Sequence, residues 1–211
     1  MCYSPEVSIG TFGFVSIVCI YAWIRNKGID RAAALIFFII VLMQLLEYFL
    51  WINQSCTPLN KLLSSFVPIL LLLQPLLLSY IVWKMNAGHG VFTPHIFYTS
   101  LLVFIPILLY TKSFGIFNTC ILKGKDGHLD WKLGKAIPYQ GIHYFIKICI
   151  TLWYYVSLIY IFATLNNNKL VYIFSSIAIL SWILSIIHFK NEWGSIWCYY
   201  VNVAAVVALL F

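Results

Sequence analysis

Polar residues inside apolar segments are the first candidates for chemistry or binding. In the stretch QLLEYFLW, Gln44, Glu47 and Trp51 are spaced by three and four residues, so they share one face of a helix. In a later apolar segment His143 and Lys147 are four apart and share a face in the same way. These groups could line a polar vestibule, where Glu47 and Lys147 could pair. The structural alternative is a protonated or backbone-bonded Glu47, a Lys147 that snorkels to the interface and a His143 that reaches the headgroups.

The cysteines allow a second kind of site. Cys2, Cys56, Cys120 and Cys198 fall at or near one membrane face if the apolar segments are counted as crossings. In an oxidising compartment they could form one or two disulfides. Alternatively, Cys120, His128 and Cys198 could bind zinc together with Cys2 or Glu47, although no closely spaced pair of ligands supports this. Free thiols are the third alternative.

The last apolar segment adds one more amide to the vestibule set. Cys198 and Asn202 are four residues apart and face the same way as each other. We expect them to face the helix that carries Glu47.

The composition places these groups in a membrane protein. Hydrophobic residues make up 63% of the 211 residues and charged residues 9%, far below the quarter that is usual in soluble domains. The net charge of +7 is dispersed over short loops, so it indicates topology rather than nucleic-acid binding. The expected partners are therefore the lipid bilayer and a small solute or ion, and the sequence leaves the oligomeric state open.

Seven apolar segments are long enough to cross a bilayer as helices. They predict an all-α fold, a seven-transmembrane-helix bundle that forms a single integral membrane domain over residues 1–211. The predicted helices are Val7–Ile24, Ala32–Asn53, Leu62–Lys84, His95–Thr111, Ile142–Leu165, Leu170–His188 and Trp193–Phe211.

The long loop between the fourth and fifth helices predicts a short hairpin or cap. Asp126 and Gly127 form a turn signal, and the sequence HLDWKL alternates as a short strand does. His128 and Trp131 could contribute a site there. The favoured interpretation is nevertheless a solvated His128 and a Trp131 that anchors the loop at the membrane interface.

The loop charges predict the orientation. Arg25, Lys27 and Arg31 follow the first helix, whereas MCYSPEVSIG contains no base, so we expect an extracytoplasmic N-terminus and a first helix that is retained. The helix count then places Cys2, Cys120, His128 and Cys198 on one membrane face.

Four motifs together resemble a family of uncharacterised polytopic membrane proteins. They are MCYSPEVS at the start, QLLEYFLW, the loop sequence GHLDW after Cys120, and GSIWC in the last segment. The family pattern is Met-Cys-Phe/Tyr-Ser, Gln-x-x-Glu-x-x-x-Trp, Gly-His-Leu-x-Trp and Gly-Ser-x-Trp-Cys. The resemblance implies a shared bundle in which the motif residues act together, among them Cys2, Glu47, Trp51, His128, Trp131 and Cys198. It implies no reaction.

Three functions follow as hypotheses. The first is binding or transport of a small solute or ion through the vestibule formed by Gln44, Glu47, Trp51, His143, Lys147 and Asn202. The second is a metal-assisted, membrane-embedded hydrolase or redox protein. The third is a structural or assembly role without a small-molecule site.

Overall fold

The computed structural model describes residues 4–88, 92–125, 127–131 and 141–166, and ten further positions between 172 and 202. These residues form the helices α1 (Pro5–Arg25), α2 (Asp30–Trp51), α3 (Pro58–Lys84), α4 (Phe92–Ser113) and α5 (Gly141–Ala163). All five are long and apolar enough to cross a membrane, so the chain is a multi-pass membrane protein. The first five predicted helices are thereby confirmed. The predicted sixth helix is described at about half of its positions and the seventh at one, so the count of seven stays a prediction.

Local sequence signals fix where several helices begin. The side chain of Ser4 accepts a hydrogen bond from the backbone N–H of Val7, and Pro5 follows it at the first helical position. Thr57 does the same for α3, where its hydroxyl accepts from the backbone N–H of Asn60. Both pairs combine an N-cap oxygen with a proline whose missing N–H costs nothing at this position.

The turn between α1 and α2 is held by an ion pair. Arg25 Nε lies 2.7 Å and its Nη2 3.0 Å from the two carboxylate oxygens of Asp30, and the backbone N–H of Lys27 donates to the same group. Because the guanidinium and the carboxylate meet in a two-pronged contact, they fix the geometry of this short turn.

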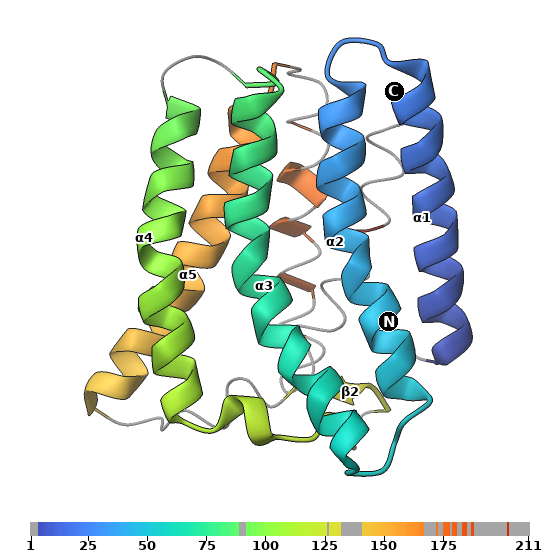
Figure 1. Ribbon diagram of the computed structural model, residues 1–211, viewed down its shortest axis with the longest axis vertical. Helices are drawn as coiled ribbons and strands as arrows, with labels where there is room; N and C mark the ends of the chain where they lie inside the picture. The colour runs from blue at the N-terminus through green and yellow to red at the C-terminus, as the bar shows by residue number, and fades with distance from the viewer. Residues whose placement is uncertain are drawn as a thin grey trace.

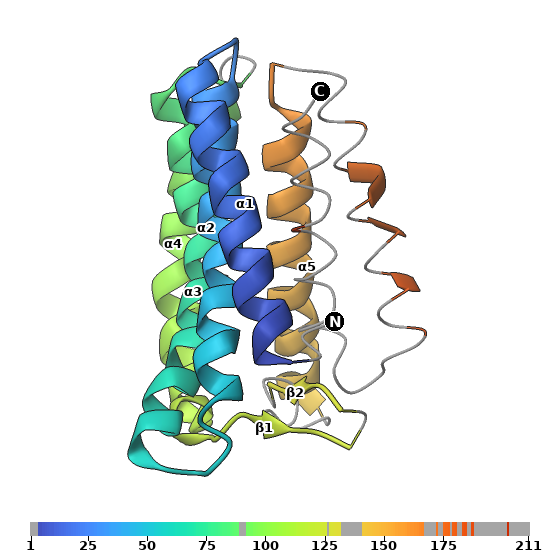
Figure 2. The same ribbon diagram turned by 90° about the vertical axis from the view of Figure 1, so that its right-hand side faces the viewer.

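Helices α1 to α4 stand side by side as antiparallel neighbours, and α5 packs behind this row against α3 and α4 (Figures 1 and 2). Helix α2 lies between α1 and α3 and is the most buried of the five. The outer faces expose large apolar side chains such as Ile24, Leu102 and Phe145. Exposed apolar surface of this extent suits lipid rather than water.

The loop after α4 contains a 3₁₀ turn, η1 (Ile116–Asn118), and the predicted hairpin. Strand β1 (Leu122–Lys123) pairs with the antiparallel strand β2 (Leu129–Asp130). Gly127 has a φ of +86° in the connection, which explains why glycine follows Asp126 here. The hairpin lies at the end of the bundle where α2 and α4 end and where α1, α3 and α5 begin (Figure 1). We call this the hairpin end.

Candidate functional site

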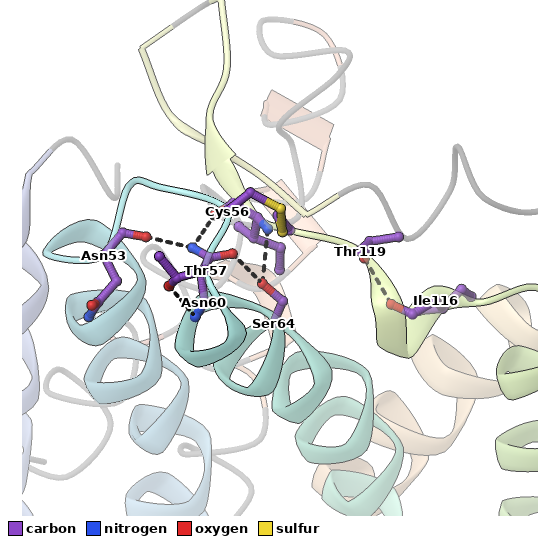
Figure 3. The surroundings of a disulfide bond; sticks show 9 residues. Asn53, Cys56, Thr57, Asn60, Ser64, Ile116 and Thr119 are labelled. Atoms are coloured by element: carbon purple, nitrogen blue, oxygen red, sulfur yellow. Dashed lines mark hydrogen bonds between the residues drawn. A yellow bond between two sulfur atoms is a disulfide. The ribbon is translucent and has the colours of Figure 1, made fainter.

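A disulfide bond fastens the loop after α4 to the bundle. Cys120 is bonded to Cys56, which lies in the turn between α2 and α3, and their Cα atoms are 5.5 Å apart (Figure 3). Of the three alternatives for the cysteines, the disulfide is therefore the correct one for Cys56 and Cys120. Cys120 in this bond is not available as a thiolate ligand for zinc. Cys2 and Cys198 lie outside the described residues. In the described part of the chain Cys19 and Cys149 are free, the first buried and the second exposed.

A buried polar network reinforces the disulfide. Asn60, in the first turn of α3, is fully buried, and its amide group donates to the backbone carbonyls of Asn53 at 2.6 Å and Ile121 at 3.0 Å. The hydroxyl of Ser64 donates to Asn60 Oδ1 and accepts from the backbone N–H of Ile121. These bonds satisfy backbone groups that would otherwise be buried without partners. Sequence reasoning missed this network, although Asn60 and Ser64 are spaced to share one helical face.

The hairpin itself lies directly over the end of α2. The side chain of Gln54 donates to the carbonyl of Leu50 at 2.8 Å and accepts from the backbone N–H of Lys123 at 2.6 Å. His128 is 2% and Trp131 8% exposed, and Leu129 between them is fully buried. The expectation of a solvated His128 and an interfacial Trp131 is therefore wrong. The disulfide, Gln54 and Asn60 draw this part of the loop onto the bundle, so its side chains join the core.

Below the hairpin, α2 carries a buried carboxyl group. Glu47 and Gln44 are both fully buried, and Gln44 Nε2 donates to Glu47 Oε2 at 2.9 Å. Glu47 lies four residues before the end of α2, which is about 6 Å along the helix axis at 1.5 Å per residue. Trp51 follows one turn later on the same face and is 8% exposed. The predicted stripe of Gln44, Glu47 and Trp51 thus faces the interior rather than lipid.

Of the two predicted site residues on α5, His143 contacts α4. Nδ1 of His143 is 3.1 Å from the hydroxyl of Tyr110 on α4, and its ring packs edge-on against Phe114 at 5.0 Å. Figure 1 shows that α5 begins beyond α4, whereas α2 ends on the other side of α3. His143 is therefore part of the α4–α5 contact, and Lys147, four residues later on α5, is half-buried. The predicted pairing of Glu47 with Lys147 stays a prediction.

Two further predictions concern Asn202 and the zinc site. Asn202 is fully buried, but it is surrounded in the sequence by residues outside the described part of the chain. Within the described residues, no three histidine, cysteine, aspartate or glutamate side chains gather as metal ligands would. The zinc hypothesis therefore gains no support from the described residues.

A second buried polar contact lies deeper in the bundle. The hydroxyl of Tyr154 on α5 donates to Gln74 Oε1 on α3, and Gln74 is 2% exposed. It joins two helices by one hydrogen bond, as polar side chains often do within membranes. The sequence signal was a glutamine next to Pro75 in an otherwise apolar segment.

No protein-family model, curated protein or solved structure matches this chain. The resemblance based on its four motifs therefore stays a prediction, and its function has to be argued from the site.

Proposed function

We propose that the protein binds a small cation or cationic solute at Glu47, and that this site belongs to a pathway that opens at the hairpin end. The observation that carries the proposal is the complete burial of Glu47 within a membrane-spanning helix, with Gln44 donating to its carboxyl group. Burial of a carboxylate in the membrane costs several kcal/mol, so such a residue is usually retained for function.

The neighbouring groups suit a cation better than an anion. Glu47 and Gln44 present carboxylate and amide oxygens, which are the ligands that ammonium groups and alkali ions prefer. Trp51 adds an aromatic surface one turn away, and the buried Asn202 is a further candidate from the last predicted helix. His143 is not included in the proposed site because it contacts Tyr110 on α4. Lys147 is not included because its positive charge would repel a bound cation.

Replacement of Glu47 by glutamine tests this function. Glu47→Gln keeps the size of the side chain and its ability to accept from Gln44, but removes the negative charge. We expect a panel of sodium, potassium, ammonium and methylammonium chlorides to include at least one salt that raises the melting temperature of the wild-type protein in detergent. The same salt should raise the melting temperature of the Glu47→Gln variant by less than a third as much.

Tyr154→Phe is the matched control. It removes a partly buried hydrogen bond to Gln74, away from the proposed site, so it should lower stability while leaving the cation response intact. If the wild-type protein and Glu47→Gln respond identically to all four salts, Glu47 has a structural role and the proposal fails.

We further propose that the hairpin end faces the extracytoplasmic side. The disulfide between Cys56 and Cys120 supports this orientation, because disulfides persist in oxidising compartments and are rare in the cytosol. The basic turn after α1, with Lys27, lies at the opposite end, as the positive-inside rule requires of a cytoplasmic loop. The lysines of the long loop count less, because charge in long loops has less influence on orientation.

A cysteine introduced at Lys27 would test this orientation. We expect Lys27→Cys, in a protein whose Cys2, Cys149 and Cys198 are replaced by alanine, to react with a membrane-impermeant maleimide only after the cells are permeabilised. Lys125→Cys, at an exposed position of the hairpin connection, serves as the control and should react in intact cells. The opposite pattern of labelling would invert the orientation.

A further inference from the structure

Two buried indole N–H groups lie at the hairpin end. Trp51 and Trp131 are each 8% exposed, and among the described residues neither Nε1 atom has a hydrogen-bond partner. A buried tryptophan usually finds an acceptor for this donor, because leaving it unpaired in an apolar interior is costly. Two such donors at one end of the bundle therefore indicate an acceptor that the described residues do not provide.

The contacts of the hairpin bring both tryptophans to the same end of α2. Gln54 joins the last turn of α2, where Trp51 lies, to the backbone of β1 at Lys123. Strand β2 pairs with β1, and Trp131 follows β2 directly. Leu129 and Trp131 are buried while Asp130 between them is only partly buried, so the alternation of the strand turns Trp131 toward the bundle.

A carboxyl group lies one helical turn away from the Trp51 donor on α2. Glu47 and Trp51 are four residues apart, so their side chains are neighbours on one face of α2. Both belong to the interior of the bundle. The hairpin end thus combines a carboxyl group, which binds an ammonium, with two N–H donors, which bind an anionic oxygen.

This combination fits a ligand with both charges. Building on the cation site proposed above, we propose that the protein binds a small zwitterion, with its ammonium against Glu47 and its acid group hydrogen-bonded to the indole N–H groups of Trp51 and Trp131. A free amino acid has this chemistry, and so does the headgroup of phosphatidylethanolamine. In either case the acid group supplies the acceptor that the two tryptophans do not find among the described residues.

The test compares glycine, methylammonium and acetate on protein in phosphatidylcholine nanodiscs. We expect glycine to bind at least tenfold more tightly than methylammonium, and acetate to bind weakest. Each of the variants Trp51→Phe and Trp131→Phe keeps the ring but removes one N–H. Each should weaken glycine binding about tenfold, the usual effect of losing one hydrogen bond to a charged group. Trp131→Phe, outside the cation site, should leave methylammonium binding unchanged.

A control variant and ¹⁵N labelling of the tryptophans show whether glycine binds at Trp51 and Trp131. Trp83→Phe, at the opposite end of α3, should leave all three affinities unchanged. In protein labelled with ¹⁵N in its tryptophans, glycine should shift the indole resonances that disappear in Trp51→Phe and Trp131→Phe. If phosphatidylethanolamine in the nanodiscs abolishes glycine binding and shifts the same resonances, the natural ligand is the headgroup, and the zwitterion proposal stands.

Two results would overturn the proposal in distinguishable ways. If methylammonium binds as tightly as glycine and is lost only in Glu47→Gln, the zwitterion proposal fails and the cation site stands. If none of the three probes binds at a site that depends on Glu47, both proposals fail.

Discussion

Removal of the disulfide is expected to destabilise the protein by about 4 kcal/mol. The bond between Cys56 and Cys120 closes a loop with a sequence separation of 64 residues. On the chain-entropy model, a crosslink of this span restricts the unfolded chain by about that amount. Replacement of both cysteines by alanine should lower the free energy of unfolding accordingly, measured by denaturant titration in mild detergent.

The control for this prediction is Cys149→Ala. Cys149 is a free, exposed cysteine on α5, so its loss should change stability by less than about 0.5 kcal/mol. If the free energy of unfolding of the double alanine variant is within 1 kcal/mol of the wild-type value, the prediction fails. The buried network alone would then hold the loop.

Replacement of Asn60 by aspartate is expected to cost about 3 kcal/mol or more. Aspartate has the same shape but no N–H donor, so the carbonyls of Asn53 and Ile121 would both lose their partner. Each buried group left unsatisfied costs about 1–3 kcal/mol. Hydrogen exchange should also accelerate at the backbone N–H of Ile121, which donates to Ser64 beside the substitution.

Asn53→Asp provides the comparison for Asn60→Asp. The side chain of Asn53 donates to the carbonyl of Phe49 in an exposed contact, so the same chemical change should cost less than 1 kcal/mol there. Equal losses of stability in the two variants would mean that the buried network does not hold the loop to α3.

The sequence predicted the elements of this fold well because they depend on local composition. Apolar segments of sufficient length identified the first five helices, and the pair Asp126-Gly127 identified the hairpin. Helical spacing also correctly grouped Gln44, Glu47 and Trp51 on one buried face. These predictions needed only the periodicity of one element and the energetic preference of apolar side chains for lipid.

The contacts between elements could not be predicted in the same way. Any of several cysteines could have paired with Cys120, and only the arrangement of the α2–α3 turn selects Cys56. The burial of His128 depends on Asn60 and Gln54, which lie more than 60 residues away in the sequence. Spacing indicated that His143 and Lys147 share a face, but it could not show that His143 meets Tyr110 on α4.

Difference infrared spectroscopy of the carboxyl groups tests the central claim, that Glu47 binds a cation, most directly. The wild-type protein and Glu47→Gln would each be measured before and after perfusion with the salt that stabilises the wild-type protein most. We predict a change in the carboxyl bands of the wild-type protein that is absent from Glu47→Gln and present in Tyr154→Phe. Identical difference spectra for the wild-type protein and Glu47→Gln would contradict the claim.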